Sequence, residues 1–498
     1  MTNNRRTSLI LIGIFFILSI YPLFAYLGNY VLHIWDEGLY AASAAELTQT
    51  GNIFVRTFNF KPDMWVTKPP LGLWLQAISI EVFGLNEFAV RFPSAVAAVL
   101  TGIIIILFAG KLQRPFIGFY AALILILSKG IIGWYHVCRS GDYESLLLLF
   151  VTTYILCFYL YCYFKKNVYL LIFFIALTLA VLTKSVQALI PMPALFLYAL
   201  YKKDVLRILK SRTFYWGILI FVLLVGTYYI GRELQNNGYL KAVWNEELGG
   251  RFNHTIDGHK HGFGFYFEKL YQYFSSYFIW ILPVAIALNW FVKSKSDNKA
   301  LSLLRKDLSI YTFGTAIVYL LIISCAKTKL EWYNIITLPL FAIFIGIALE
   351  RIHFFIKERT NKVLPFVFMI ALFSYPALKA VNSVQELKNF DTNWDTKRVN
   401  RFYIMKRIAN KELPYQNLKV ILWGDKEWDN NYDSFFYFYI MREKGVNLTY
   451  RNLISDVQVG DTLLVNEPRT MAIIDSLFAY EVLLSEYDNR IISIQAKK

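Results

Sequence analysis

Ionisable and aromatic side chains gather in compact clusters that border long apolar segments of the chain. The acidic members are Asp36, Glu37, Asp142 and Glu144. The basic members are Lys68, Arg139, Lys184, Lys327 and Lys329, and the aromatic neighbours are Trp35, Tyr40 and Tyr333. Acidic, basic and aromatic groups collected beside apolar segments suit a site that handles an anionic amphiphile.

These residue types match the needs of sugar transfer from a lipid phosphate. A carboxylate would take the proton of the acceptor hydroxyl, and we assign this role to Asp36, with Glu37 beside it. The five basic residues are candidates to hold the phosphate and stabilise the departing charge. Asp142, Glu144 and the three aromatic residues would line the substrate groove. Simpler roles stay open, because acidic pairs often cap helices and a lysine such as Lys184 can be a snorkelling anchor.

A His-x-His pair, His259 and His261, lies in a loop between two apolar segments. With a carboxylate, these imidazoles could hold a divalent metal that assists the phosphate. Pairs of this kind are also common in solvent-exposed loops. The four cysteines show no metal-binding spacing, so a divalent metal at the histidine pair is the cofactor that the sequence suggests.

The composition indicates an integral membrane protein. The chain has 498 residues, of which 56% are hydrophobic and 17% aromatic, and its formal net charge is +16. Residues 381–498 contain 16 basic and 16 acidic residues, so the whole excess of positive charge lies among the apolar segments of residues 1–380. Basic residues in the short loops of a membrane protein report its topology. We therefore expect no nucleic-acid partner.

Eleven apolar segments have the length of membrane-spanning helices. With Arg5 and Arg6 in the cytoplasm, the clustered Lys and Arg residues all fall on the inner side, as the positive-inside rule requires. The acidic and aromatic clusters then lie outside, and residues 69–83 form a helix along the outer surface. The expected spans are about 8–29, 92–110, 115–131, 145–164, 167–183, 187–201, 213–231, 271–292, 308–325, 333–350 and 363–379.

Two domains are expected. Residues 1–380 form the membrane domain, whose outer loop 30–90 carries the first acidic cluster. After residue 380, short β-like runs such as 418–423 and 462–465 alternate with helix-like stretches. Residues 381–498 are therefore predicted to be a soluble α/β domain on the outer side, facing the periplasm if the membrane is a bacterial inner membrane.

Three motifs give the chain a family resemblance. They are Trp-Asp-Glu-Gly-Leu-Tyr at 35–40, Lys-Pro-Pro-Leu-Gly-Leu-Trp-Leu at 68–75, and Phe-Gly-Leu-Asn-Glu-Phe-Ala-Val-Arg-Phe-Pro-Ser at 83–94. In this order they resemble the start of the bacterial protein-mannosyltransferase and aminoarabinose-transferase superfamily, and weaker similarity extends to about residue 340. The resemblance implies a C-type glycosyltransferase with 11–13 transmembrane helices that uses a polyprenyl-phosphate sugar. It also implies inverting transfer, with Asp36 as the base and Lys68 and Arg139 at the lipid phosphate.

The chain departs from that pattern at two positions. Thr67 stands where the aminoarabinose branch has a glutamate that can bind a metal, and Glu144 stands where the family often has aspartate. The sugar therefore stays open, and the acceptor could be a lipid A, a protein or a glycan. A flippase for a lipid-linked sugar is the alternative class. It would be expected to show inverted repeats or charges near the bilayer midplane. A membrane-anchored scaffold is the third class of function, but a scaffold would give the outer clusters of ionisable residues no role.

Overall fold

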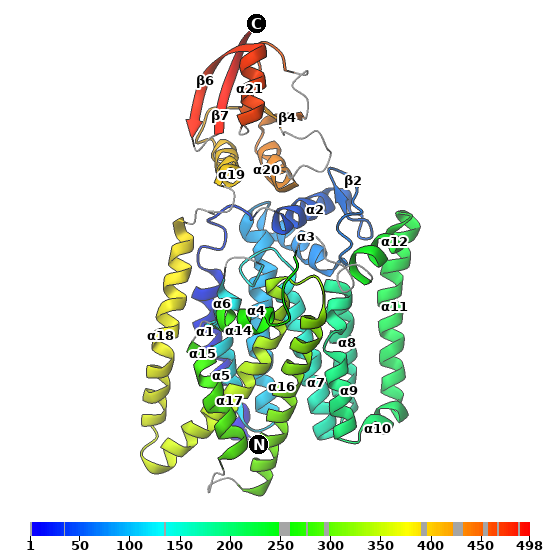
Figure 1. The fold of residues 1–498 in the computed structure, drawn as a ribbon, viewed down its shortest axis with the longest axis vertical. Helices are drawn as coiled ribbons and strands as arrows, with labels where there is room; N and C mark the ends of the chain where they lie inside the picture. The colour runs from blue at the N-terminus through cyan, green and yellow to red at the C-terminus, as the bar shows by residue number, and fades with distance from the viewer. Residues whose placement is uncertain are drawn as a thin grey trace.

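The computed structural model describes residues 2–33, 35–133, 136–248, 259–274, 277–292, 298–389, 396–421, 432–451, 457–465, 468–486 and 489–498. A bundle of long helices carries a small sheet domain at one end, and the two chain termini lie at opposite ends of the long axis (Figure 1). The end of the bundle that meets the C-terminal domain is called the domain end.

Eight helices within the described residues are long and apolar enough to cross a membrane. A helix of 23 residues is about 35 Å long, which exceeds the hydrocarbon thickness of a bilayer. These spans are built on α1 (Thr2–Phe24), α4 (Glu87–Lys111), α7 (Glu144–Phe164), α8 (Asn167–Lys184), α11 (Arg212–Gln235), α16 (Lys299–Cys325), α17 (Thr337–Arg359) and α18 (Leu364–Glu386).

The other three expected spans form shorter or broken helices. Segment 271–292 falls on a helix pair bent by 109°. Segments 115–131 and 187–201 form helices of 12 and 10 residues, the second of which begins only after Pro191 because proline interrupts helical hydrogen bonding. The multi-span helical fold is confirmed, and the count of eleven stays a prediction. These elements are α14 (Phe265–Tyr273), α15 (Tyr277–Ile286), η3 (Ala287–Phe291), α5 (Pro115–Ile126), η1 (Ser185–Leu189) and α9 (Met192–Tyr201).

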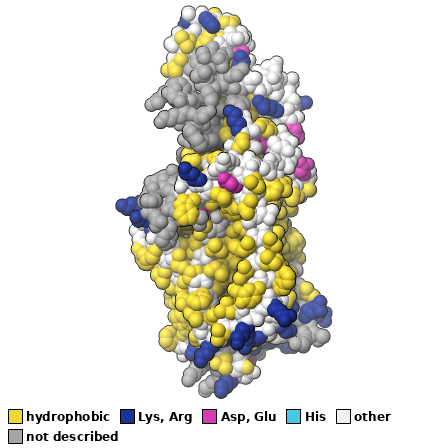
Figure 2. All heavy atoms as spheres, turned by 90° about the vertical axis from the view of Figure 1, so that its right-hand side faces the viewer, with side chains coloured by type: hydrophobic (Ala, Val, Ile, Leu, Met, Phe, Trp, Pro, Cys, Tyr) yellow, Lys and Arg dark blue, Asp and Glu magenta, His cyan; other side chains and the backbone are white. Residues whose placement is uncertain are grey.

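The surface of the bundle has the distribution that a membrane requires. Figure 2 shows a broad hydrophobic belt, with Lys and Arg side chains gathered at the end away from the C-terminal domain. Helices α11 and α18 are buried over only 11% and 28% of their apolar windows. Because apolar side chains exposed over a whole span are favourable only in lipid, these two helices face the bilayer.

Short elements cover the domain end of the bundle. Helix α2 (Asp36–Thr50) packs against α3 (Leu71–Phe83), and α3 in turn packs on α4. Helix α3 is the segment expected along the surface, and with 13 residues it is too short to span. The other short elements of the chain, of which α10 lies at the opposite end of the bundle (Figure 1), are β1 (Thr57–Phe58), β2 (Lys61–Pro62), α6 (Lys129–Ile132), α10 (Val205–Lys210), α12 (Tyr239–Val243), η2 (Trp244–Leu248), η4 (Glu331–Ile336) and η5 (Leu387–Asn389).

The C-terminal domain is a five-stranded sheet in the order β4-β3-β5-β7-β6. Strand β3 pairs in parallel with β4 and β5, whereas β7 pairs antiparallel with β5 and β6. The predicted small α/β domain is therefore present, while α18 continues past residue 380. The elements of the C-terminal domain are α19 (Thr396–Ala409), β3 (Asn417–Ile421), α20 (Tyr432–Glu443), β4 (Asn447–Arg451), β5 (Thr462–Val465), α21 (Pro468–Leu477), β6 (Phe478–Glu486) and β7 (Asn489–Lys497).

The C-terminal domain shares a hydrophobic core with the domain end. Ala41 and Ala45 of α2 belong to the same buried cluster as Phe436 and Met441 of α20. Polar contacts reinforce this junction, since the Tyr437 hydroxyl accepts a hydrogen bond from the main-chain N–H of residue 32 at 2.7 Å. The two parts therefore form one packed structure around α2.

Candidate active site

Glu37 anchors the start of α2 through a buried ion pair with Arg91 of α4. Its two carboxylate oxygens lie 2.7 Å from Arg91 Nε and 3.0 Å from Nη2, and neither side chain is exposed. The carboxylate also accepts hydrogen bonds from the main-chain N–H groups of His33 (2.6 Å) and Gly141 (2.7 Å). Glycine permits this approach at 141, where a Cβ would lie 2.6 Å from Val90. The remaining donors of Arg91 bond the carbonyls of Leu27, Tyr30 and Val31.

The electrostatics of this pair determine what Glu37 can do. Burial alone would raise the pKa of the Glu37 carboxyl, but the positive charge of Arg91 lowers it to about 2. A carboxylate with four N–H donors and such a low pKa is a poor proton acceptor. The geometry therefore favours a positioning role for Glu37 over the predicted catalytic role, which stays a prediction.

Arg139 is also structural. Its guanidinium is fully buried and donates hydrogen bonds to the carbonyls of Pro22 (2.7 Å) and Ala25 (2.5 Å) at the end of α1. Arginine commonly satisfies the free carbonyls at a helix C-terminus. This geometry argues against the predicted phosphate-binding role of Arg139.

Asp36, His136 and Asp142 form a compact polar cluster at the domain end. One ligand atom from each side chain lies within 4.8 Å of the others. His136 Nδ1 lies 3.1 Å from the Asp142 carboxylate, and its ring stacks on Trp332 with centroids 3.6 Å apart. Asp142 is buried, and its Oδ1 has no hydrogen-bond partner among the described residues. A buried carboxylate oxygen without a partner is a candidate to accept a hydrogen bond from a substrate or to bind a cation.

Backbone strain accompanies this cluster. Trp35, directly before Asp36, has φ +73°, and His136 has φ +51°. Positive φ is unfavourable for both residue types and is found preferentially where function requires a fixed geometry. The predicted substrate residue Trp35 itself is exposed at this edge of the site.

A second group of side chains borders the cluster. The Tyr40 ring stacks on Tyr143 with centroids 4.4 Å apart, and the Arg56 guanidinium lies 4.9 Å from the Tyr40 centroid. Burial, followed by the charges of Asp36 and Asp142, raises the pKa of the Tyr40 phenol, so Tyr40 stays protonated. Arg56 is buried and donates to the Tyr143 hydroxyl at 2.7 Å.

Two further predicted pairs come together across long sequence separations. Lys184 forms a buried ion pair with Glu144. Lys68 Nζ lies 3.1 Å from the Glu247 carboxylate, to which the Thr67 hydroxyl donates at 3.0 Å. A carboxylate from residue 247 thus reaches both Thr67 and Lys68.

The predicted site residues between 327 and 333 differ in exposure. Lys327 is exposed, whereas Lys329 is buried and bonds the carbonyl of Ala326. Tyr333 is half-buried, and its carbonyl accepts a hydrogen bond from Tyr319 at 2.8 Å.

The predicted metal pair is not supported by the geometry. His259 and His261 are exposed, and His261 stacks on Phe265 with centroids 4.1 Å apart. Neither belongs to the metal-capable cluster found within the described residues, which is the group of Asp36, His136 and Asp142. The group of Asp36, His136 and Asp142 is therefore a better candidate for a metal site than the histidine pair.

Sequence reasoning missed His136, Arg56 and Glu247. His136 lies three residues before Arg139 and six before Asp142, and this proximity in sequence is the signal that could have found it. Arg56 stands in no motif, and Glu247 becomes relevant only through its contact with Lys68, 179 residues earlier.

Comparison with known proteins extends these observations. The family model for dolichyl-phosphate-mannose-protein mannosyltransferases matches residues 67–230. An undecaprenyl phosphate-alpha-4-amino-4-deoxy-L-arabinose arabinosyl transferase of Aeromonas hydrophila is 28% identical over 62% of this chain and 53% of its own length. A putative mannosyltransferase of Bacillus subtilis is 30% identical over 35% of this chain and 26% of its own length. The chain thus spans about half or less of these two relatives' length.

Solved structures share the fold over nearly the whole chain. ArnT from Cupriavidus metallidurans, crystallised with undecaprenyl phosphate, has a TM-score of 0.70 at 14% identity and covers 96% of this chain and 97% of its own. An oligosaccharyltransferase of Archaeoglobus fulgidus reaches a TM-score of 0.52 at 12% identity over 91% of this chain and 64% of its own.

Fold and site thus define a multi-span membrane protein with a buried, ionisable centre beneath a small α/β domain. The predicted resemblance is confirmed: residues 67–230 match the protein-mannosyltransferase family model, and the chain is similar to aminoarabinose transferases in sequence and to ArnT in fold.

Proposed function

We propose that the chain transfers a sugar from a polyprenyl-phosphate carrier to a hydroxyl of a lipid, protein or glycan acceptor, with inversion at the anomeric carbon. The observation that carries this proposal is the Asp36–His136–Asp142 cluster at the domain end of the bundle. The relatives named for undecaprenyl-phosphate sugars and for mannosyl transfer support the donor class.

Asp36 is the group assigned to the acceptor. It begins α2 and is half-buried, whereas its neighbour Glu37 is saturated with hydrogen bonds. Asp36 therefore accepts the proton of the acceptor hydroxyl as that oxygen attacks the anomeric carbon.

Buried cations are assigned to the donor phosphate. Nε and Nη1 of Arg56 have no hydrogen-bond partner among the described residues, and leaving such donors unsatisfied is costly. An anionic phosphate oxygen would satisfy them, so Arg56 takes the role that the sequence assigned to Arg139. Lys68 and Lys184, each already facing one glutamate, add positive charge around the leaving group.

A divalent cation fits the central cluster. Arg91 neutralises Glu37 and Lys184 neutralises Glu144, which leaves the carboxylates of Asp36 and Asp142 with one imidazole between them. Two carboxylates and one imidazole are a common donor set for a divalent ion. Such an ion would neutralise charge on the departing phosphate. Asp142 Oδ1, His136 and one carboxylate oxygen of Asp36 would hold it, and the second oxygen of Asp36 would take the acceptor proton.

The side of the membrane is inferred from charge. Lys and Arg side chains gather at the end opposite the C-terminal domain (Figure 2), which the positive-inside rule assigns to the cytoplasm. The N-terminus is then cytoplasmic, and the reaction centre and C-terminal domain face the periplasm of a bacterial inner membrane.

The test is consumption of carrier-linked sugar from a bacterial lipid extract by purified protein. Mass spectrometry would follow loss of polyprenyl-phosphate sugars and the appearance of free polyprenyl phosphate. The wild type and Asp475→Asn, which changes an exposed acid of α21, should consume one species. Asp36→Asn should remain folded and lose at least a hundredfold in rate. Equal consumption by Asp36→Asn would remove the assigned base.

A further inference from the structure

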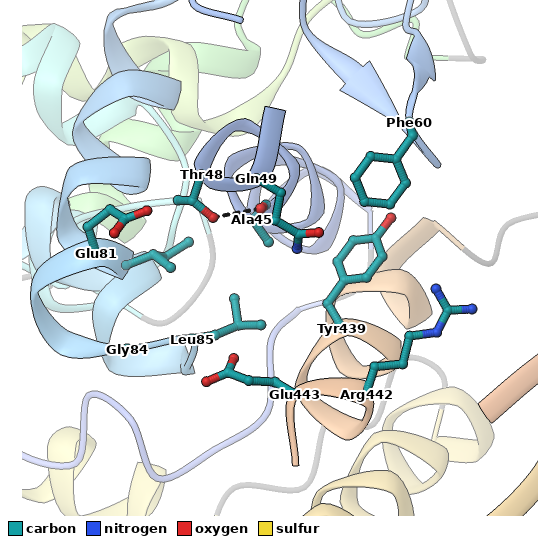
Figure 3. Close-up of a pocket in the computed structure, with 11 residues that line it drawn as sticks. Ala45, Thr48, Gln49, Phe60, Glu81, Gly84, Leu85, Tyr439, Arg442 and Glu443 are labelled. Carbon is teal, nitrogen blue, oxygen red and sulfur yellow. Dashed lines mark hydrogen bonds between the residues drawn. The ribbon is translucent and has the colours of Figure 1, made fainter. Parts of the chain in front are cut away.

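A cavity of about 590 Å³ lies where the membrane domain meets the C-terminal domain. Figure 3 shows its walls, which come from α2, from the end of α3 and from α20, with Phe60 at the rim. This volume lies within the ordinary range of small-molecule sites. The lining residues are Ala45, Thr48, Gln49, Phe60, Ile80, Glu81, Gly84, Leu85, Tyr439, Arg442 and Glu443.

One buried carboxylate links α2 and α20 to the β1–β2 turn at the rim. Glu46 of α2 is fully buried and accepts hydrogen bonds from the main-chain N–H groups of Asn59 (2.7 Å) and Phe60 (2.9 Å). It also accepts the hydroxyl of Tyr439 from α20 at 2.5 Å. Charge-assisted hydrogen bonds of this length are strong. The cavity is therefore a preformed site whose shape α2, the β1–β2 turn and α20 fix jointly.

The lining chemistry suits a sugar. Side chains of Gln49, Glu81, Arg442 and Glu443 are exposed and offer both donors and acceptors. The rings of Phe60 and Tyr439, 5.8 Å apart and edge to face, add aromatic surface, which can pack against the C–H faces of a saccharide. Two carboxylates against one guanidinium disfavour a phosphate or a sugar acid.

The cavity is distinct from the reaction centre but is joined to it by one helix. Asp36 is the first residue of α2, and Gln49 is near its end. Thirteen residues at 1.5 Å each separate them by about 20 Å. We propose that this cavity binds an uncharged saccharide portion of the acceptor. This proposal rests on the proposed transferase function.

The binding test uses the full-length protein in lipid nanodiscs. The probe is the pool of oligosaccharides released from the bacterial envelope by mild acid and separated into uncharged and acidic fractions. Retained glycans are quantified by equilibrium dialysis and mass spectrometry. Gln49→Trp places an indole in the cavity, and Thr50→Trp, at the exposed neighbour outside the lining, is the matched control.

The wild type and Thr50→Trp should retain uncharged glycans, and Gln49→Trp should weaken retention at least tenfold at an unchanged melting temperature. Retention that is absent in the wild type, equal in Gln49→Trp, or confined to the acidic fraction would overturn the proposal. Asp36→Asn should bind like the wild type, because binding needs no turnover.

Kinetics separate this proposal from the transferase function itself. Gln49→Trp should raise the KM for the acceptor at least tenfold and leave kcat unchanged, since it touches none of the reacting groups. Loss of kcat with an unchanged KM would contradict an acceptor site in the cavity. Failure of the Asp36→Asn test, by contrast, would remove the assigned base while leaving glycan retention as a separate result.

Discussion

Replacing Glu37 with glutamine tests whether this residue anchors α2 or takes part in the chemistry. All four groups that contact the carboxylate are N–H donors, from Arg91 and from the main chain of His33 and Gly141. A glutamine amide supplies one acceptor oxygen, so its NH₂ group must face donors on the other side. Arg91 would also become a buried charge without its partner.

The expected cost is large. Removing one partner of a buried ion pair destabilises a protein by about 3–5 kcal/mol. The pKa of Glu37 gives an independent figure, because a fall from 4.5 to about 2 corresponds to about 3 kcal/mol at about 1.4 kcal/mol per unit. We therefore expect Glu37→Gln to lower the free energy of unfolding by about 3 kcal/mol or more.

The assay is SDS titration in mixed micelles, followed by tryptophan fluorescence, on wild type, Glu37→Gln and Asp36→Asn. Asp36 is half-buried and outside the ion pair, so Asp36→Asn should unfold within about 1 kcal/mol of wild type while losing turnover. The reasoning is refuted if Glu37→Gln unfolds like wild type but is inactive, because Glu37 would then act in the chemistry.

Arg139→Met should reduce stability by about 1–3 kcal/mol yet leave the KM for the donor within twofold; a tenfold rise in that KM in the folded fraction would restore its phosphate role. Burial raises the pKa of the Glu247 carboxyl, but the positive charge of Lys68 lowers it by more, so that this pKa lies below 4.5. The stabilisation by the Lys68–Glu247 pair is therefore present above pH 4.5 and is lost as the pH falls through the pKa of the folded state. The melting-temperature gap between wild type and Glu247→Gln should accordingly stay constant from about pH 7 to pH 5 and shrink as the pH falls from 4.5 to about 3, and a gap that stays constant below pH 4.5 would contradict the ion pair. After dialysis against a divalent metal, the Asp142→Asn variant should retain less than a tenth of the metal that the wild type retains, measured by inductively coupled plasma mass spectrometry. Equal metal content in the two proteins would exclude Asp142 as a ligand.

The sequence located the membrane helices well because hydropathy over about 20 residues is a local property. It assigned the base to Asp36, but it could not show that its neighbour Glu37 is held in a buried ion pair. Successive residues of a helix point about 100° apart, and only the packed structure reveals that Arg91 lies on the side of Glu37. The same limit applies to Arg139, whose carbonyl partners on α1 lie more than 110 residues away. Long-range pairing thus separates structural charges from functional ones.

Helix α2 connects the proposed reaction centre to the cavity. Its two fully buried glutamates, Glu37 and Glu46, are nine residues apart, which places them on opposite sides of the helix at about 100° per residue. Glu37 binds Arg91 of the membrane bundle, and Glu46 binds Tyr439 of the C-terminal domain. Since α2 is pinned from both sides, the separation of about 20 Å between Asp36 and the cavity is fixed. If the cavity binds the acceptor as proposed, an acceptor that occupies both places would need a glycan of matching length, and the C-terminal domain would then contribute to acceptor choice.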